Sequence, residues 1–246
     1  MKLSRLFVDI PIVIGQTLTL PQDATHYLLN VLRLPVGTSL TLFNGQSGEY
    51  SARITAYTKK NAQIFVDRHQ SIERESSLQL ILVQAISRSE HMDHTIQKSV
   101  ELGVQRIIPI IAERSPPLNK LILAKRYQHW KRVMISACEQ CGRNRLPVLS
   151  EPESFGEWNK RPQEGLCIVL FPRAKHTLAQ VLIPDYPITI LNGPEGGLTE
   201  EEVKQTLQLG YVDVHLGPRI MRTETSVIAI LSACQAIVGD WQIKWR

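Results

Sequence analysis

Residues 188–203 decide the fold, and their sequence reads ITILNGPEGGLTEEEV. The apolar start of this stretch is typical of a buried strand. Thr199, with Glu202 three positions later, forms the pattern of a capping box, which predicts that a helix begins there. Between strand and helix, residues 193–197 hold three glycines and a proline, which allow a sharp turn and a close backbone approach to a ligand. Glycine content alone leaves two interpretations open, a ligand-binding loop or a plain structural turn.

The same alternation of strand and helix continues on both sides of this stretch. Apolar runs predict strands at 78–86, 106–112, 166–171, 188–192 and 212–216. Helical patterns predict helices at 89–102, 119–140, 199–209 and 223–239. This order indicates an α/β fold, a parallel sheet covered by helices. A small β-rich unit and a polar linker precede it, with short strands predicted at 40–43, 50–54 and 62–66 and the linker at 71–77.

Two further loops follow strands at the sheet edge where ligands of parallel sheets bind. The first reads LFPR at 170–173, and the second reads LGPRIMRTET at 216–225. Thr223 or Thr225 is a candidate cap for the helix that follows. Because a helix start disfavours a cation, Arg222 predicts a partner there: a carboxylate, a phosphate or a substrate carbonyl. None of these loops has the Walker A or G-x-G-x-x-G pattern, so neither ATP hydrolysis nor an ordinary dinucleotide site is indicated.

Composition limits the class of protein. With 246 residues, 43% of them hydrophobic and 21% charged, the chain is long enough for one large domain or two modest ones. No apolar run approaches the roughly 20 residues of a membrane helix, and no signal peptide is recognised, so we expect a cytoplasmic protein. Cys138 and Cys141 form a C-x-x-C pattern, but no second pair follows at zinc spacing. Helix packing is therefore favoured over metal binding.

The charge distribution indicates an acidic partner. The net charge is +5, and residues 113–145 hold eight Lys and Arg residues against two Glu. Such a stretch is either a solvated helix face or a surface that follows the phosphates of a nucleic acid.

The loops at 192–199 and 216–225 resemble the signature of the RsmE family of SPOUT methyltransferases. Three more blocks are similar to this family: HYLLNVLRL at 26–34, QKSVELGV at 97–104 and ACEQCGR at 137–143. The five blocks follow one another in the order expected for the family, which makes the resemblance specific.

The resemblance implies a C-terminal SPOUT α/β domain, residues 73–246, whose parallel sheet carries a deep trefoil knot. It implies a small PUA-like β-barrel that binds RNA at residues 1–72. It also implies a homodimer without metal that uses S-adenosylmethionine to methylate N3 of a uridine in 16S ribosomal RNA, within the small ribosomal subunit. The residues expected to bind the cofactor are Leu170, Phe171, Gly193, Glu195, Gly196, Gly197, Leu216, Ile220, Met221 and Thr225.

The chemistry of this reaction assigns further roles. N3 of uracil is protonated at neutral pH, so its methylation needs a base or stabilisation of the deprotonated ring. Arg222 is the predicted catalytic cation. Glu224, or alternatively Glu195, is the predicted carboxylate that accepts the proton or orients the arginine. Contacts to the RNA backbone are predicted for five residues, each equally well explained by a surface or packing role: Arg5, His26, Arg33, Arg114 and Arg143.

Three other functions fit part of the sequence. A SPOUT methyltransferase acting on another RNA, such as transfer RNA, fits the two loops, but the blocks at 26–34 and 137–143 argue against it. An RNA-binding module without catalysis fits the basic stretch, but the intact loop at 216–225 argues against it. A Rossmann oxidoreductase fits the strand and helix order but lacks G-x-G-x-x-G.

Overall fold

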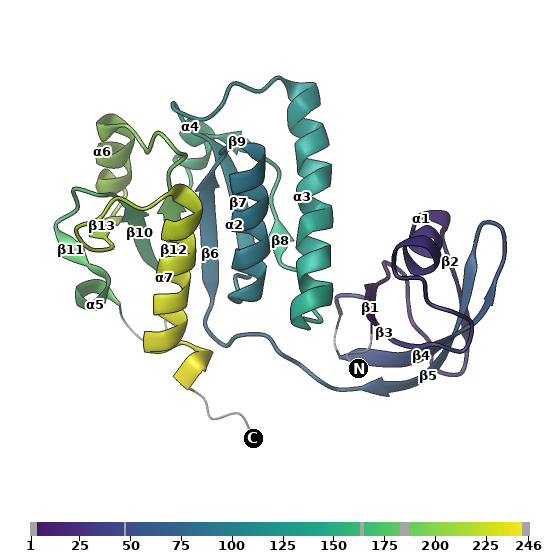
Figure 1. The fold of residues 1–246 in the computed structure, drawn as a ribbon. Coiled ribbons are helices and arrows are strands. Elements are labelled where there is room, and N and C mark those ends of the chain that lie inside the picture. Colours follow the sequence, from purple (N-terminus) through teal and green to yellow (C-terminus); the bar gives the residue numbers. More distant parts are fainter. Residues whose placement is uncertain (1–3, 47, 163–164, 183–186, 243–246) are drawn as a thin grey trace. The chain divides into compact units, whose positions relative to one another are not determined.

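The structure, a computed structural model, describes residues 4–46, 48–162, 165–182 and 187–242 (Figure 1). The expected outer domain limits, residues 1 and 246, lie outside these ranges. Two compact units divide the chain. The N-terminal unit comprises Met1–Glu75 and Cys138–Leu146, and the C-terminal unit comprises Ser76–Ala137 and Pro147–Arg246.

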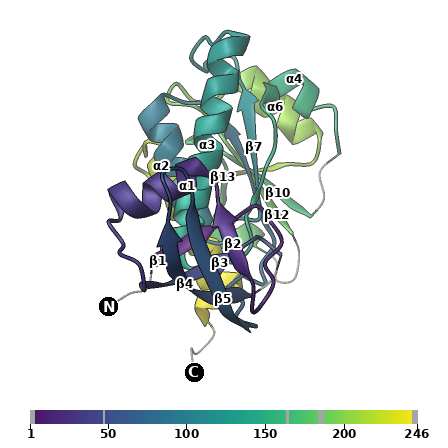
Figure 2. The same ribbon diagram turned by 90° about the vertical axis from the view of Figure 1, so that its right-hand side faces the viewer.

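Within the described residues, the N-terminal unit forms a five-stranded sheet in the order β1-β3-β4-β5-β2 (Figure 2). Its elements are β1 (Ser4–Phe7), β2 (Thr17–Leu20), α1 (Gln22–His26), the π-helical turn η1 (Tyr27–Val31), β3 (Ser39–Phe43), β4 (Glu49–Tyr57) and β5 (Ala62–Gln70). β1 joins β3 in parallel, and the other neighbours are antiparallel.

Alternation of side chains across these strands builds the core of the N-terminal unit. Leu42, Ile54 and Ile64 each point to the apolar side and are fully buried. The strands predicted at 40–43, 50–54 and 62–66 are confirmed as β3, β4 and β5. β1 and β2 were not predicted, because four residues each are too few to show a clear period of two.

The part of the C-terminal unit that the structure describes forms an eight-stranded sheet in the order β11-β13-β10-β12-β6-β7-β8, with β9 also on β7. All of its strand pairs are parallel. The strands are β6 (Leu80–Ala85), β7 (Arg106–Ile111), β8 (Val148–Leu149), β9 (Glu153–Ser154), β10 (Leu166–Leu170), β11 (His176–Thr177), β12 (Ile188–Asn192) and β13 (Val212–His215). The helices are α2 (Ser89–Glu101), α3 (Lys120–Cys141), α4 (Phe155–Trp158), α5 (Leu178–Val181), α6 (Glu200–Gln208), α7 (Thr223–Val238) and the short 3-10 turn η2 (Asp240–Gln242). The last turn of α3, from Cys138, is counted with the N-terminal unit.

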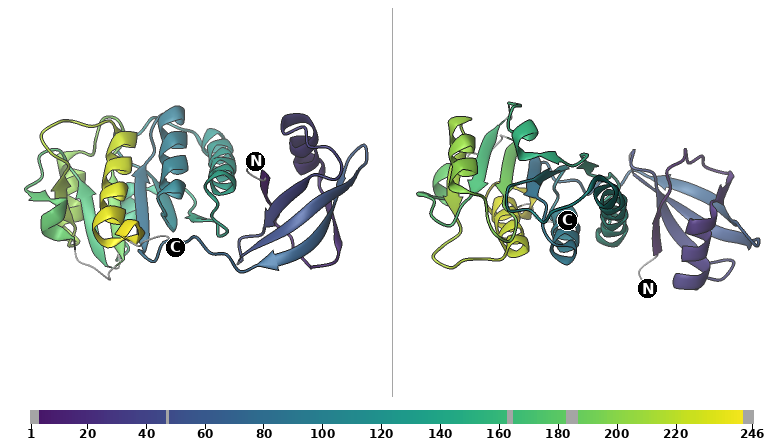
Figure 3. Two further views of the ribbon diagram at one scale, coloured as in Figure 1. Left: turned by 60° about the horizontal axis from the view of Figure 1, so that its bottom comes forward. Right: turned by 90° about the horizontal axis from the view of Figure 1, so that it is seen from above.

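The predicted α/β alternation is confirmed, and every strand and helix expected between residues 78 and 239 is present within a few residues of its predicted bounds. The central strand β12 is buried along its whole length, as its unbroken apolar run requires. Helices cover both faces of the sheet (Figure 3). α2 and α7 lie side by side on one face, whereas Trp158 of α4 and Val203 of α6 join a core cluster with strand residues on the other.

Two properties of the described residues bear on the class of protein. No helix among them is long and apolar enough to cross a membrane, and no group of three or more His, Cys, Asp and Glu side chains is placed to hold a metal ion.

Cys138 is fully buried in the last turn of α3, where burial raises the pKa of its thiol to about 12.

Candidate functional site

A cavity of about 420 Å³ lies at the edge of the C-terminal sheet where β10, β12 and β13 end. Its wall comes mainly from the three loops that follow these strands, joined by Arg114, Thr223 and Ser226. β13, β10 and β12 are parallel neighbours, so their carboxyl ends and the loops beyond them meet at one edge. The volume falls in the range of small-molecule sites, about 300–1,000 Å³.

The residues predicted to bind the cofactor meet at this cavity. All of them line its wall except Thr225, which is exposed on the first turn of α7. Leu170, Leu216, Ile220 and Met221 give the wall an apolar part. Ile220 is 86% exposed, so an apolar ligand surface placed there would remove it from water. Cofactor binding by these residues stays a prediction.

The loop at residues 193–198, which we call the glycine loop, needs its glycines for geometric reasons. A Cβ atom added to Gly193 would lie 2.9 Å from the backbone nitrogen of Leu198. Gly197 has a φ of +71°, in the left-handed region that favours glycine. Its backbone N–H donates to the carbonyl of Pro194 at 2.8 Å, which closes the turn. At its three glycines the loop therefore presents backbone to the cavity.

The predicted capping box at the start of α6 is confirmed. The Thr199 backbone N–H donates to Oε2 of Glu202 at 2.8 Å, and the Glu202 backbone N–H donates to Oγ1 of Thr199 at 3.2 Å. The other carboxylate oxygen of Glu202 accepts from the backbone N–H of Glu113 at 2.9 Å. This single carboxylate thus joins the end of the glycine loop to the loop after β7.

A buried polar network, which sequence reasoning missed, lies directly behind the cavity. Asn192 at the end of β12 donates to Oε1 of Gln84 in β6 at 2.9 Å and to Oγ1 of Thr223 at 2.8 Å. The Thr223 hydroxyl in turn donates to the carbonyl of Gly193 at 2.7 Å. The one available signal was the amide side chains inside apolar strands, since buried amides need partners. The network fixes the start of α7 against the glycine loop.

Arg222 occupies the N-cap position of α7, which corrects the prediction that Thr223 or Thr225 would cap the helix. The Thr223 side chain is already used in the buried network, and Thr225 points outward. Arg222 is exposed, and among the described residues it forms no ion pair. Arg222 is therefore open to solvent, between two residues, Met221 and Thr223, that line the cavity.

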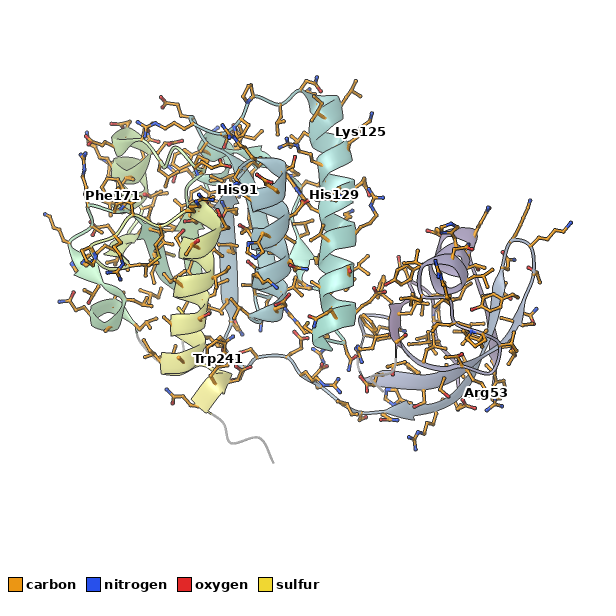
Figure 4. The ribbon with its side chains drawn as sticks, viewed as in Figure 1. Arg53, His91, Lys125, His129, Phe171 and Trp241 are labelled. Carbon is orange, nitrogen blue, oxygen red and sulfur yellow. The ribbon has the colours of Figure 1, made fainter. Side chains whose placement is uncertain are left out.

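Glu224, the predicted catalytic carboxylate, does not line the cavity. Its Oε2 atom lies 2.9 Å from Nδ1 of His91, in the first turn of α2. Glu195 does line the cavity, and its Oε1 accepts from the backbone N–H of Arg88 at 2.8 Å. Figure 4 labels His91 beside the adjoining ends of α2 and α7. Neither Arg88 nor His91 was singled out from the sequence, because nothing local marks them.

The residues predicted to contact RNA lie in different surroundings. Arg5 and Arg143 are buried in the N-terminal unit, where Arg5 pairs with Glu49 and Arg143 pairs with Glu75. In this conformation both hold the unit together instead of facing solvent. His26 and Arg33 are exposed. Arg114 belongs to the C-terminal unit, lines the cavity and donates to the carbonyl of Gly196 at 2.8 Å. RNA contact by any of the five stays a prediction.

Family models match most of the chain. Residues 74–235 match an RNA methyltransferase domain, and residues 20–67 match an RNA methyltransferase PUA domain. The chain is similar to a protein of Buchnera aphidicola subsp. Schizaphis graminum named ribosomal RNA small subunit methyltransferase E. The identity is 36% over 97% of this chain and 98% of that protein. A Bacillus subtilis protein of the same name is 27% identical over 94% and 95% of the two chains.

Solved structures give the same picture. A methyltransferase of Legionella pneumophila, in complex with the bound cofactor S-adenosylmethionine, superposes with a TM-score of 0.94 at 37% identity, covering 98% of this chain and all of that one. A ribosomal RNA small subunit methyltransferase E of Neisseria gonorrhoeae, bound to S-adenosylmethionine, gives a TM-score of 0.90 at 36% identity, with coverage of 98% and 100%.

Proposed function

Because this chain belongs to the ribosomal RNA small subunit methyltransferase E family, we propose that it transfers the methyl group of S-adenosylmethionine to N3 of a uridine in 16S ribosomal RNA. The chain is an RNA methyltransferase with a PUA domain. One observation carries the assignment of the site: three loops far apart in sequence, which hold nearly all the predicted cofactor residues, line one cavity at the edge of a parallel sheet.

The residues of the cavity fit S-adenosylmethionine. The apolar side chains of Leu170, Leu216 and Met221 suit the flat faces of an adenine ring, and the three glycines of the glycine loop line the cavity without side chains. Backbone amides and carbonyls of the loop suit the polar edges of the ligand. When bound, this cofactor supplies an activated methyl group on a positively charged sulfur.

The protein must then help the acceptor nitrogen to lose its proton. The N3 electron pair forms the new bond to the methyl carbon as the carbon–sulfur bond breaks and its electron pair stays on the sulfur, and the N3 proton leaves to a base or to water. Arg222 lies next to the cavity and stabilises the negative charge that spreads over the two uracil carbonyl oxygens. Glu224 supports the start of α7 through His91, and Glu195 is the carboxylate on the wall of the cavity.

The proposal includes a trefoil knot, a barrel and a homodimer. We assign the loop at 216–222 to a trefoil knot, in which the chain passes the glycine loop before it enters α7. The bond from Thr223 to the carbonyl of Gly193 supports this path. We further propose a PUA-like barrel at residues 1–72, a SPOUT domain at 73–246 and a homodimer. The enzyme acts in the cytoplasm on RNA within the small ribosomal subunit, which His26 and Arg33 contact from the N-terminal unit and Arg114 contacts from the C-terminal unit.

The test is methyl transfer to the natural class of substrate. The purified protein is incubated with methyl-labelled S-adenosylmethionine and small ribosomal subunits from cells that lack this modification, and the nucleosides are then analysed. Label in N3-methyluridine is expected. Label in a different nucleoside, or in transfer RNA offered in parallel, would replace the substrate with another RNA. Cofactor binding without any transfer would favour an RNA-binding module that has lost catalysis.

A further inference from the structure

Three carboxylates from three segments surround His91. Its Nδ1 lies 2.9 Å from Oε2 of Glu224 and 3.9 Å from Oε1 of Glu195, and its Nε2 lies 3.4 Å from Oε1 of Glu90. The side chains of His91, Glu224 and Glu195 are 19%, 14% and 30% exposed, whereas Glu90 is 86% exposed. His91 therefore lies in a partly buried, acidic environment beside the cavity (Figure 4).

The charge on the imidazole decides how it acts on Glu195 and Glu224, because both carboxylates face Nδ1 whereas Nε2 faces Glu90. A neutral imidazole has one N–H, whereas the protonated ring has two and carries a positive charge. Glu195 and Glu224 both approach the same nitrogen, so without a cation between them their charges repel each other in partly desolvated surroundings. A cation at position 91 removes that repulsion and attracts both groups.

The two carboxylates belong to the two chain segments whose relative position shapes the cavity. Glu195 lies in the glycine loop, and its Oε1 also accepts from the backbone N–H of Arg88. Glu224 follows Arg222 and Thr223 at the start of α7, and Thr223 lines the cavity. A link through His91 of α2 therefore joins the glycine loop to the start of α7, in addition to the buried amide network.

We propose that His91 is a positioning residue: a cationic clamp between Glu195 and Glu224 that sets Arg222 against the acceptor base bound at the cavity. The inference rests on the proposed function, since it names a residue that acts on the same site. The imidazole could instead accept the N3 proton. The two roles predict opposite effects on kcat when His91 is replaced by lysine.

The discriminating variant is His91→Lys, which keeps a cation and removes the imidazole. His91→Gln keeps a hydrogen-bond donor and removes the charge. His94→Ala is the matched control, because His94 lies on the same helix, is exposed and lies outside the cavity wall. Each full-length variant is compared for thermal midpoint, for S-adenosylmethionine affinity by calorimetry, and for kcat and KM with small ribosomal subunits.

For a clamp, His91→Gln lowers kcat by about tenfold or more, the effect of losing one charge-assisted hydrogen bond. His91→Lys stays within about threefold of the parent protein, and His94→Ala is unchanged. Equal loss of kcat in both His91 variants, with cofactor affinity intact, would overturn the clamp in favour of the proton acceptor. Unchanged kcat in His91→Gln would also overturn it.

A measurement without RNA separates this inference from the proposed function. Thermal midpoints and cofactor affinities are measured for His91→Gln, Glu224→Gln and the double variant. The clamp predicts non-additive effects, because the second substitution removes an interaction that the first has already lost. Additive effects would show that the two side chains do not act together. If the parent protein methylates no RNA, the proposed function is rejected. The comparison of the single and double variants can still be interpreted, because it needs no RNA.

Discussion

Arg222 stands at the N-terminal end of α7, where the partial positive charge of the helix opposes a cation. It forms no ion pair with any described residue that would offset this cost. Its neighbour Thr223 lines the cavity and is fixed by the buried network. An unpaired guanidinium next to an anchored residue is suited to bind negative charge that develops only during a reaction.

We therefore expect Arg222→Ala to lower kcat by about a hundredfold, the usual effect of removing one donor to a developing oxyanion. The affinity for S-adenosylmethionine should change by less than about threefold, because Arg222 is not part of the cavity wall. Turnover and calorimetry on the same preparation give both values. Arg106→Ala is the control, as Arg106 is exposed at the start of β7, the opposite end of a parallel strand. Equal losses of turnover and affinity would indicate a binding role.

At the scale of the element, the glycine loop connects β12 to α6, and hydrogen bonds and backbone contacts hold it at several points. The capping box fixes its end at Thr199, and Arg114 holds the carbonyl of Gly196. Gly193 packs against the backbone of Leu198, a neighbour that cannot rotate away as a side chain could. The loop has little freedom to absorb an added methyl group.

Gly193→Ala should consequently displace the glycine loop and weaken S-adenosylmethionine binding by at least about tenfold, as overpacking against backbone costs on the order of 1–3 kcal/mol. Calorimetric titration measures the change in affinity. Gly156→Ala is the matched control, because nothing lies within 4 Å of its added Cβ and its φ is ordinary. Undiminished affinity in Gly193→Ala would mean that the loop relaxes freely or is not the cofactor site.

At the scale of the whole molecule, ion pairs join distant parts of the chain into the N-terminal unit. Glu49 accepts from both Arg5 and Arg74, and Arg5 also donates to Oδ1 of Asn144 at 2.6 Å. Burial by itself would raise the pKa of Glu49, but the hydrogen bonds from Arg74 and Arg5 outweigh it and hold the pKa below its ordinary value. The cluster brings residues from 138–146 into a unit otherwise made of the first 75 residues.

This pairing predicts how the unit responds to acid. A carboxylate whose pKa is lower in the folded state stabilises the fold above its unfolded pKa of about 4.3, and the contribution is lost as pH falls through the folded pKa. Glu49→Gln should cost about 3 kcal/mol at pH 7, because it leaves a buried cation with one partner fewer. The difference in free energy of unfolding between Glu49→Gln and the parent protein should shrink as the pH is lowered below 4.

Urea unfolding of both proteins at several pH values, followed by circular dichroism, measures this gap. Asp67→Asn serves as the control, since Asp67 pairs with Arg53 at the surface, where side chains are 33% and 50% exposed. That substitution should cost less than about 1 kcal/mol at every pH. A gap for Glu49→Gln that stays constant with pH would show that its loss is due to packing and not to charge.

The sequence by itself determined the features that depend on neighbouring residues. Apolar runs and helical periods located the strands and helices between residues 78 and 239, and the Thr199 and Glu202 pair located a helix start. The family resemblance identified the loops that line the cavity. These signals are readable because each lies within one element or one turn.

Only the tertiary structure decided which residues from different elements meet. Gln84, Asn192 and Thr223 form one network because β6 and β12 are neighbours in the sheet although 108 residues separate Asn192 from Gln84. His91 meets Glu224 across 133 residues, and this contact takes the predicted catalytic carboxylate out of the cavity wall. Strand order and helix packing set these distances, and no local pattern encodes them, because a side chain's partners depend on the whole chain's path.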